Sequence, residues 1–586
     1  MFLFLWGSMT LLPGQSFQWA YHAGSIFGTD DEKVYRSFCD EHNNSYVLIY
    51  YSDIMNSQLN NLPINLPSSG LNNFSFLVLV SYDCEGNLRW YRSIQNVLYS
   101  LYTGYEENGS VIKTNVSMEM IDNHIILTAL GSCNRFYLRD ENGHDTLLTH
   151  RDSIDNYSDI IISLDTNGSL VWNNSVSHGI YPVTDYNHVY SYAPMCITHD
   201  SDHNVIVLSK IYPFTGIPSF PLVNDNLLYM LKYNPEGVLL SVKPFLFDSG
   251  MGATNNWKKP HLSYYGEKYY FIGYTFSDTI IVNEQPIPIP EGGYSKPYIA
   301  CLDSSGHCER YLRMSPSGNC STLEISDNGD IYVIGGFSDT IGGVVINPGN
   351  EGAGMVIVKF DTLFNTVYAK IISHSINCYI DVNSSILLPD NKIAIGGRMT
   401  GSIITFDSIQ FSFTGYDCYV AIFDEEQMQY VHATRIVSEE NALGITALTA
   451  DNQNNLIVCG SYRGDNVLVG DSVFDNYGDL DIFIGRYGWE CGEEADWHST
   501  GIGENSLPES SLKLYPNPAI SLVTLESETA VMETVSIFNL MGQQQNSQTV
   551  NDHHCTLDIS GLAPGLYLLR ASFPDGRSET LRFVKQ

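Results

Sequence analysis

Short apolar runs separated by polar turns fill most of the chain, and one phrase recurs along it. An apolar run is followed by a turn of the form Asp-x-x-Gly and then by a second run that often contains Trp or Tyr. Aspartate can cap such a turn through its side chain, and glycine adopts the positive φ that other residues resist. The runs are rich in β-branched and aromatic residues, which favour strands. The phrase therefore predicts β-hairpins.

The phrase occurs seven times, and a second phrase precedes each copy. The apolar runs before the turn occupy residues 76–82, 159–164, 227–233, 298–302, 355–360, 419–423 and 481–487. The second phrase, a polar turn and then a short apolar strand, occupies residues 43–51, 122–131, 203–210, 266–273, 327–336, 390–397 and 452–460. With one more short run upstream, each unit has about four strands. The pattern predicts an all-β fold with a seven-bladed β-propeller at residues 17–490, six or eight blades being the alternatives.

The two ends of this array complement each other. The last unit stops after its third strand at Gly488, whereas residues 17–20 match the fourth strand of other units, at 88–91 and 170–173. We expect the N-terminal strand to complete the last blade and close the ring, because closure pairs an otherwise open sheet edge. The array resembles the broad bacterial β-propeller repeat families.

A different pattern begins after the repeats. Residues 491–510 are mostly polar and contain Gly and Pro, which predicts a linker. Residues 511–586 contain short alternating strands between turns, which suits a small antiparallel β-sandwich. Their motifs, Tyr-Pro-Asn-Pro at 515–518, Asn-Leu-Met-Gly at 539–542, Pro-Gly-Leu-Tyr at 564–567 and Phe-Val-Lys at 583–585, resemble the C-terminal sorting domain of type IX secretion cargo.

This resemblance implies a route out of the cell. It implies export through the periplasm, recognition by the type IX secretion machinery at the outer membrane, and a secreted or cell-surface protein that often loses its sorting domain. The residues that match the family's motifs are Tyr515, Pro516, Asn517, Pro518, Gly542, Gly565, Tyr567 and Lys585. The apolar opening of the chain, followed by small residues before Phe17, predicts a signal peptide at residues 1–16, an N-terminal buried strand being the alternative.

Net charge, hydropathy and cysteine spacing limit the kinds of partner, segment and site that we expect. The chain has 65 acidic and 29 basic residues, a formal net charge of −36, so it repels phosphate backbones and no nucleic-acid partner is expected. No later run is long and apolar enough to predict a transmembrane segment. The 12 cysteines contain no Cys-x-x-Cys pair, and most are interpreted as small buried residues, with disulfides left open.

No motif supplies catalytic chemistry, so no catalytic or cofactor-binding residue is assigned. Serine-hydrolase elbows, zinc helices and phosphate-binding loops are absent. The turns at Asp83 and Asp165 resemble the Asp-box of sialidase propellers but carry an extra residue, and Arg398 and Arg463 match that family's arginine cluster only loosely. A structural turn is the alternative. Carboxylate pairs from different blades would leave no local motif, so a secreted glycoside hydrolase or lyase stays open.

Two further patterns concern metal binding and modification. The acidic loops at 152–159 and 475–481 offer several oxygens that suit Ca²⁺, with a solvated loop as the alternative, so the metal is left unknown. Asp followed by Ser or Thr and an aliphatic residue resembles the acceptor motif for bacterial O-glycosylation, with shared ancestry of the repeats as the alternative. The acceptors are Thr146, Ser153, Thr279, Thr340, Thr362, Ser408 and Ser472.

Taken as a sequence, the chain is best interpreted as a non-catalytic binding or adhesion module at the cell surface. Its 38 tyrosines offer ring faces for sugars, although most should pack in the core. The expected ligand is a glycan or a host-surface protein. The alternatives are a polysaccharide-degrading enzyme, which a cluster of Asp or Glu with displaced pKa values would favour, and an inert scaffold.

Overall fold

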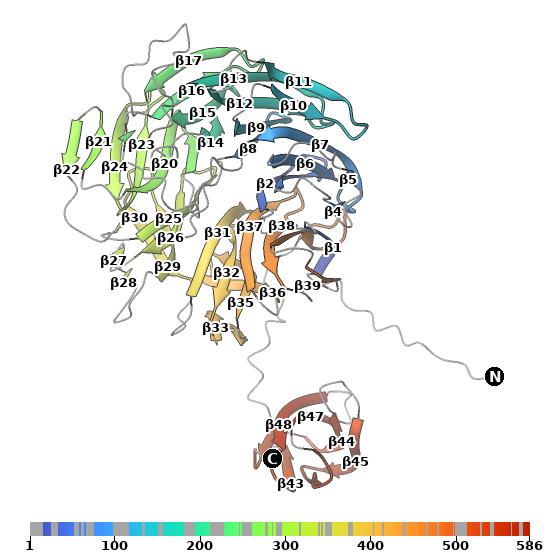
Figure 1. Cartoon of the computed structure of the whole chain (residues 1–586). Coiled ribbons are helices and arrows are strands. Elements are labelled where there is room, and N and C mark those ends of the chain that lie inside the picture. Colours follow the sequence, from blue (N-terminus) through green and yellow to red (C-terminus); the bar gives the residue numbers. More distant parts are fainter. Residues whose placement is uncertain are drawn as a thin grey trace. The chain divides into compact units, whose positions relative to one another are not determined.

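A computed structural model of the chain contains two compact units, Met1–His498 and Ser499–Gln586 (Figure 1). It describes residues 16–24, 33–51, 58–59, 64–65, 75–97, 116–131, 135–150, 156–180, 194–210, 228–244, 247–248, 261–275, 279–283, 285–288, 296–315, 318–337, 340–341, 344–345, 354–372, 379–401, 403–412, 415–437, 441–464, 467–470, 472–476, 480–495, 497, 512–517, 519–527, 530–538, 544–563, 565–573 and 578–585. The regular elements of these residues are all strands, so the all-β prediction is confirmed. Most of the expected signal peptide lies outside them.

Within the described part of the first unit, the strands form seven groups of four. Group 1 contains β2 (Lys33–Cys39), β3 (Ser45–Tyr51), β6 (Ser75–Tyr82) and β7 (Leu88–Val97); group 2 contains β8 (Ser117–Ile121), β9 (His124–Gly131), β12 (Asn156–Asp165) and β13 (Leu170–Ile180); group 3 contains β14 (Pro194–His199), β15 (Val205–Lys210), β16 (Leu228–Tyr233) and β17 (Leu239–Pro244). Group 4 contains β19 (His261–Tyr265), β20 (Lys268–Thr275), β23 (Lys296–Leu302) and β24 (Cys308–Arg313); group 5 contains β25 (Gly318–Ile325), β26 (Ile331–Phe337), β29 (Gly354–Phe360) and β30 (Thr366–Ile371). Group 6 contains β31 (Tyr379–Leu388), β32 (Lys392–Thr400), β35 (Tyr416–Asp424) and β36 (Gln429–Ile436); group 7 contains β37 (Asn441–Ala450), β38 (Leu456–Arg463), β41 (Asp481–Gly488) and β1 (Ser16–Ala23).

Neighbouring strands of a group are antiparallel, and group 7 takes its fourth strand from the other end of the chain. In that pair, Phe17 lies opposite Tyr487, and Ala23 lies opposite Ile482. Groups 1 and 2 are joined into a ten-stranded sheet because Val97 pairs with Gly131 and a further hairpin pairs with β7.

The first strands of the seven groups contact one another in a circuit. β2 contacts β8, β8 contacts β14, and the contacts continue through β19, β25, β31 and β37 back to β2. Figure 1 shows the groups following one another around the middle of the unit. The first strand of each group is therefore its innermost strand.

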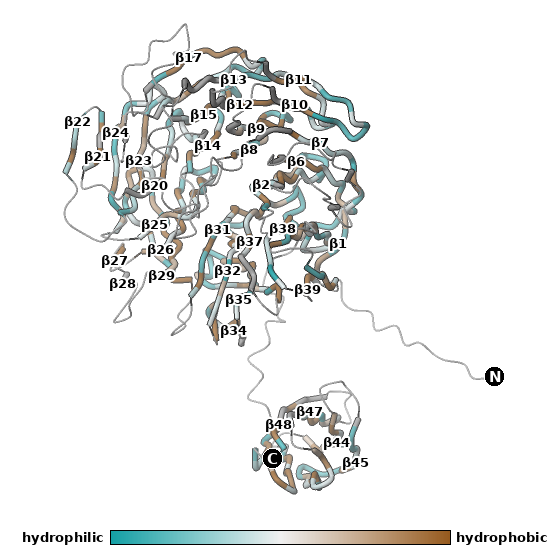
Figure 2. The backbone as a smooth tube through the Cα atoms, viewed as in Figure 1, coloured by the Kyte–Doolittle hydropathy of each residue, from teal (hydrophilic) through white to brown (hydrophobic). Residues whose placement is uncertain are grey.

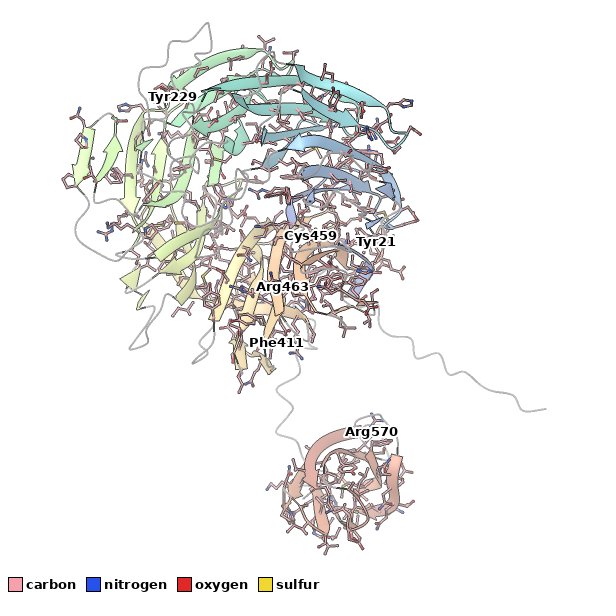
Figure 3. All side chains as sticks on the ribbon, in the orientation of Figure 1. Tyr21, Tyr229, Phe411, Cys459, Arg463 and Arg570 are labelled. Atoms are coloured by element: carbon pink, nitrogen blue, oxygen red, sulfur yellow. A yellow bond between two sulfur atoms is a disulfide. The ribbon has the colours of Figure 1, made fainter. Side chains whose placement is uncertain are left out.

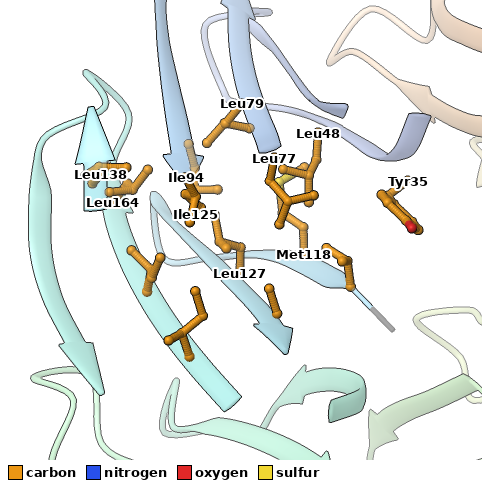
Figure 4. Packing of buried hydrophobic residues seen from close by; sticks show 14 of the residues in the cluster. Tyr35, Leu48, Leu77, Leu79, Ile94, Met118, Ile125, Leu127, Leu138 and Leu164 are labelled. Carbon is orange, nitrogen blue, oxygen red and sulfur yellow. The ribbon is translucent and has the colours of Figure 1, made fainter. Parts of the chain in front are cut away.

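Apolar side chains from neighbouring groups share a buried core at each junction of this circuit. Groups 1 and 2 meet around Leu48, Leu77, Met118 and Leu127 (Figure 4), and groups 7 and 1 meet around Val47, Cys459 and Ile484. The five other junctions have cores of the same kind. The apolar stretches in Figure 2 follow these strands. Such burial on both faces explains why the central strands read as continuous apolar runs.

Small hairpins lie between the second and third strands of most groups. They are β4 (Gln58–Leu59) with β5 (Ile64–Asn65), β10 (Arg135–Arg139) with β11 (Asp145–His150), β21 (Thr279–Val282) with β22 (Gln285–Pro288), β27 (Thr340–Ile341) with β28 (Val344–Val345), β33 (Ile403–Phe406) with β34 (Ile409–Ser412), and β39 (Val467–Val469) with β40 (Ser472–Phe474). A short strand, β18 (Phe247–Asp248), pairs with β21. Ile280, Ile341 and Phe406 insert from these hairpins into the shared cores, so the hairpins are part of the packed fold.

The Asp-x-x-Gly phrase forms the tight turns that were expected from it. In the turn between β6 and β7, Asp83 Oδ1 accepts hydrogen bonds from the backbone N–H groups of Glu85 (3.0 Å) and Asn87 (2.8 Å). Gly86 closes the turn with a φ of 88°. Asp165 and Gly168 repeat this arrangement between β12 and β13. The aspartate is thus satisfied by its own turn, which is the physical reason for the recurring sequence.

The fourth strands of groups 1–5 and of group 7 donate hydrogen bonds to the turn of the next group. Trp90 Nε1 in β7 donates to Thr166 O (3.0 Å), and its ring lies on Gly168, where a Cβ would be 2.8 Å from the indole. The other pairs are Trp19 Nε1 to Cys84 O (3.1 Å), Trp172 Nε1 to Pro235 O (2.9 Å), Lys243 Nζ to Ser304 O (3.3 Å), Arg310 to Thr362 O, and Lys370 Nζ to Met428 O (3.1 Å). The Trp of the phrase therefore links neighbouring groups.

The segment that follows β41 packs on the first unit. Cys491 forms a disulfide with Cys84 of group 1. Trp497 is buried, donates from Nε1 to Asn454 O (2.7 Å), and packs edge-on against Trp489 with ring centroids 5.1 Å apart. Residues 491–495 and 497, part of the predicted linker at 491–510, thus belong to the first unit.

The second unit has two antiparallel sheets around one buried core. One sheet has β42 (Leu512–Tyr515), β43 (Leu522–Ser527) and β46 (His554–Asp558); the other has β45 (Gln544–Asp552), β44 (Met532–Phe538), β47 (Gly565–Ser572) and β48 (Ser578–Lys585). Val523 and Leu557 from the first sheet share this core with Val535, Leu569 and Phe583 from the second. The strands alternate between buried and exposed residues, as expected for sheets with one solvated face.

Candidate functional sites

Charged side chains from three of the innermost strands interact in the first unit. Arg36 on β2 interacts electrostatically with Glu119 on β8 and with Glu324 on β25, and the two glutamates influence each other. Ser385 on β31 donates a hydrogen bond to Glu324 Oε1 (2.8 Å). All three charged side chains are half-buried. These residues come from separate repeats, so no local motif reveals them.

Burial changes the protonation of both glutamates. It raises the pKa of Glu119 to about 7, and the Arg36 charge only partly opposes the rise. Burial also raises the pKa of Glu324 to about 7, against the opposing effects of the Ser385 hydrogen bond and Arg36. Desolvation disfavours the charged carboxylate, which is why both values rise. Carboxyl groups that titrate near neutral pH are suited to exchange protons.

A second cluster occupies one face of the group 6 sheet at the start of β31. Arg398 on β32 lies opposite Asp381 on β31, and Tyr379 and Tyr416 lie on its two diagonals. The Arg398 guanidinium is 5.6 Å from the ring centroid of Tyr379 and 5.4 Å from that of Tyr416. Tyr379 also donates its hydroxyl to Asp381 Oδ2 (3.2 Å). Cation–π contacts of this kind hold both rings in place.

Strand β37 of group 7 passes close to this cluster at Gly444. A Cβ on Gly444 of β37 would lie 2.9 Å from Asn383 Nδ2 and 3.1 Å from Arg398 Cβ, and the residue has a φ of 113°. Only glycine lets β37 pass this close. The two tyrosine rings remain exposed, 49% for Tyr379 and 37% for Tyr416. The surface formed by Tyr379, Asp381, Arg398 and Tyr416 is called the Tyr–Arg–Tyr site below.

The two arginines considered from sequence have different surroundings. Arg398 belongs to the Tyr–Arg–Tyr site, whereas Arg463 lies in β38 opposite Asn441 (Figure 3). The sequence offered Arg398 only as a loose match to an arginine cluster. Its aromatic neighbours are 18 or 19 residues away in the chain, and only the strand register brings the three side chains together.

The acidic loops considered for Ca²⁺ are only partly described. Residues 152–155 lie outside the described residues, Asp475 is exposed and Asp481 is buried. In the portion of the chain that the structure describes, His, Cys, Asp and Glu side chains form no group of three or more that could hold a metal ion. The metal therefore stays unassigned.

The motif for O-glycosylation recurs in the inserted hairpins. Thr146, Thr279, Thr340, Ser408 and Ser472 lie in or between the paired strands of five different hairpins, and Thr362 lies in the turn between β29 and β30. Thr146, Thr362 and Ser408 are exposed, whereas Ser153 is outside the described residues. The motif aspartates also have structural partners: Asp145 pairs with Arg139, and Asp407 accepts from Lys370 Nζ (2.7 Å). Modification stays a prediction.

The motif residues of the second unit hold its first segment against its last strand. Asn517 Oδ1 accepts the backbone N–H of Val584 (2.9 Å), and Ala519 N donates to Val584 O (2.8 Å). Tyr515 is exposed and donates its hydroxyl to Glu526 Oε2 (3.0 Å). Pro516 follows it through a cis peptide bond.

The later motif residues lie on the paired strands β47 and β48. Gly565 pairs with Lys585, and the Tyr567 ring stacks on Phe583 with centroids 5.6 Å apart. The Tyr567 hydroxyl donates to Ala563 O (3.0 Å). Pro518 and Gly542 lie outside the described residues. The motif thus links both ends of the unit.

Within the described residues, no helix is long and apolar enough to cross a membrane. The cysteines agree with the sequence interpretation: Cys196, Cys301, Cys418 and Cys459 are free and buried. Burial raises the pKa of the Cys196 and Cys418 thiols to about 12, which keeps them protonated and unreactive.

The solved structures to which the chain is similar have low sequence identity to it and low TM-scores. A protein of unknown function from Bacteroides caccae has 12% identity and a TM-score of 0.28, covering 56% of this chain and 79% of its own. PorZ, a surface component of the type IX secretion system of Porphyromonas gingivalis, has 9% identity and a TM-score of 0.24, and the match covers 96% of this chain and 100% of PorZ. YCF48 bound to D1 peptide has 8% identity and a TM-score of 0.33, and the match covers 80% of this chain and 95% of YCF48. None of these likenesses bears on function.

The second unit has a clear family match. No curated protein matches the chain. Residues 513–586 match the family described as the secretion system C-terminal sorting domain. The match covers the motifs at 515–518, 539–542, 564–567 and 583–585 from which the domain was predicted. The chain therefore carries a type IX secretion C-terminal sorting domain and is exported to the cell surface or the medium.

Proposed function

We propose that the first unit is a seven-bladed β-propeller, closed by β1, that acts outside the cell as a non-catalytic binding module. The circuit of contacts from β2 through β37 and back to β2 supports closure. The shared core between groups 7 and 1 supports it as well, because β1 contributes Ala23 to that core. Closure by β1 pairs the edge of β41 that would otherwise be open, and a propeller presents the loops at the two ends of its ring to ligands.

The Tyr–Arg–Tyr site is the observation that carries the binding function. Two exposed aromatic rings are fixed in orientation by one arginine, which is itself positioned by strand register. Aromatic and arginine side chains contribute most of the energy at recognition surfaces, and little conformational entropy is lost when their geometry is fixed in advance. Export by the sorting domain places this site where it can meet ligands outside the cell.

One observation favours a second candidate function. Glu119 and Glu324 both have a pKa near 7 and interact with each other, which suits a general acid and a general base. Glycoside hydrolases use such a pair of carboxyl groups. The second candidate is therefore a secreted polysaccharide-degrading enzyme with Glu119 and Glu324 as its reactive pair.

The two functions are separated by one experiment on the whole exported chain. The purified protein is applied to an array of polysaccharides and extracellular-matrix proteins, and every polysaccharide that binds is assayed for new reducing or unsaturated ends. Saturable binding without product is the expected result. Product formation that disappears in both Glu119→Gln and Glu324→Gln would establish the enzyme instead. An array without any binding would contradict both and leave a scaffold.

A further inference from the structure

We propose that the Tyr–Arg–Tyr site binds a neutral polysaccharide, laid across Tyr379 and Tyr416. This inference rests on the proposed binding function and adds to it the class of ligand and the residues that recognise it. It is carried by three features of the site: the placement of its rings, its paired hydrogen-bonding groups and its balanced charge.

The placement of the rings suits a chain of sugars. Tyr379 and Tyr416 both lie opposite Thr400, on the strands that flank β32. Strands are spaced about 4.8 Å apart, so the two tyrosine backbones are about 10 Å apart, which is longer than one pyranose ring. The C–H face of a sugar packs on an aromatic ring because the ring face is apolar and electron-rich. Two rings at this spacing therefore match successive residues of a saccharide chain.

The polar groups between the rings suit sugar hydroxyls. Asp381 is a hydrogen-bond acceptor, and Arg398 is a donor on the opposite strand. A hydroxyl group both donates and accepts, so it can engage an adjacent carboxylate and guanidinium together. Directional groups beside an apolar platform give such a site its selectivity.

The charge of the site favours a neutral ligand over an acidic one. Asp381 lies directly opposite Arg398, so the one positive charge of the site faces one negative charge. The whole chain has a formal net charge of −36, which repels polyanions over distances comparable with the Debye length. Uronic-acid polymers and sulfated glycans would meet this repulsion without an unpaired cation to offset it.

Affinity electrophoresis of the whole exported chain tests the inference. Native gels contain a neutral β-glucan, xylan or mannan, and parallel gels contain alginate or polygalacturonate. We expect at least one neutral polymer to retard the protein, and the acidic polymers to leave it unaffected. Tyr379→Ala and Tyr416→Ala should each weaken the apparent Kd at least tenfold, whereas Tyr379→Phe, which keeps the ring, should stay within about threefold of the parent.

Tyr311→Ala is the matched control, because Tyr311 on β24 of group 4 is also exposed, at 38%, and lies outside the site. It should bind as the parent does, and thermal melting confirms that each variant is folded. Unchanged binding by folded Tyr379→Ala and Tyr416→Ala variants would refute the site while the binding function stands. Retardation only by acidic polymers, or array binding only to proteins, would refute the ligand class. A protein that binds nothing contradicts the proposed function as well.

Discussion

Single side chains fix how the repeats of this chain meet. The Trp in the recurring phrase was recognised as a repeated position, but its role follows from the structure: Trp90 donates to Thr166 O in the next group and lies on Gly168. Trp19 and Trp172 make the equivalent hydrogen bonds, and Gly86 and Gly237 lie beneath their rings. The glycine thus serves both the turn, which needs a positive φ, and the indole, which needs its close approach.

Gly168→Ala should destabilise the first unit more than Gly143→Ala does. Both glycines have a positive φ, 76° and 82°, so both substitutions add a backbone cost of about 1–2 kcal/mol. Only at Gly168 would the new Cβ also meet an indole, at 2.8 Å, whereas Gly143 has open space around it. Overpacking adds about 1–3 kcal/mol. Urea unfolding followed by Trp fluorescence measures the difference, and equal losses for the two variants would contradict the role given to Trp90.

Glu119 should make the stability of the first unit depend on pH. Its pKa is about 7 in the folded chain, above the ordinary value of 4.5, so the folded state holds a proton that the unfolded state has released. The folded state is therefore most stable, relative to the unfolded state, below pH 4.5. It loses this contribution to the free energy of unfolding as the pH rises toward and through 7. Glu119→Gln removes the ionisation, so its Tm should exceed that of the parent by roughly 1–3 °C at pH 8 and by much less at pH 5.

The control for this experiment is Glu236→Gln, which changes an exposed glutamate. Its melting temperature should follow that of the parent at both pH values. Glu324 remains in the Glu119→Gln variant and can still titrate, so only the difference between the Tm gains at the two pH values is diagnostic. A Glu119→Gln variant whose Tm gain is the same at pH 5 and pH 8 would show that this carboxyl is not held protonated.

At the scale of strands and turns, the sequence predicted what local periodicity can encode. The Asp-x-x-Gly turns, the apolar runs and the strand pattern of residues 17–20 follow from residues close together in the chain. The pairing of that strand with β41 was predicted from the repeat, because the last unit lacks its fourth strand. The inserted hairpins were missed because their strands are only two to six residues long and look like loops. Their buried residues, such as Ile280 and Phe406, are explained only by the neighbouring sheet.

The candidate sites escaped prediction for a related reason. Glu119 and Glu324 come from repeats 205 residues apart, and neither has a distinctive neighbour in sequence. Tyr379, Arg398 and Tyr416 are closer, but their proximity depends on the register of three strands, which a one-residue slip would destroy. The sorting domain was recognised because its motifs are local and specific, and the family match at residues 513–586 confirms it.

For the whole molecule, the junction between groups 7 and 1 decides whether the first unit is one cooperative body. Every other junction joins groups that follow one another in the chain, whereas this one joins residues more than 400 positions apart, such as Cys84 and Cys491. Loop-closure entropy opposes such contacts, and a covalent link removes much of that cost from the unfolded chain. The disulfide lies between group 1 and the segment that packs on group 7, where this cost is greatest.

Removing this link should therefore lower stability at the junction without altering the strands. Cys84→Ser, Cys491→Ser and the double variant should each reduce the free energy of unfolding by about 2–5 kcal/mol. The three losses should be equal, because either substitution breaks the same bond. Denaturant unfolding under oxidising conditions measures them, and reducing agent should bring the parent to the same value. Additive losses in the double variant would show that the two cysteines stabilise the unit separately. Hydrogen exchange should then place the earliest opening at β1 and β41, because the pairing of these two strands joins residues from distant parts of the chain.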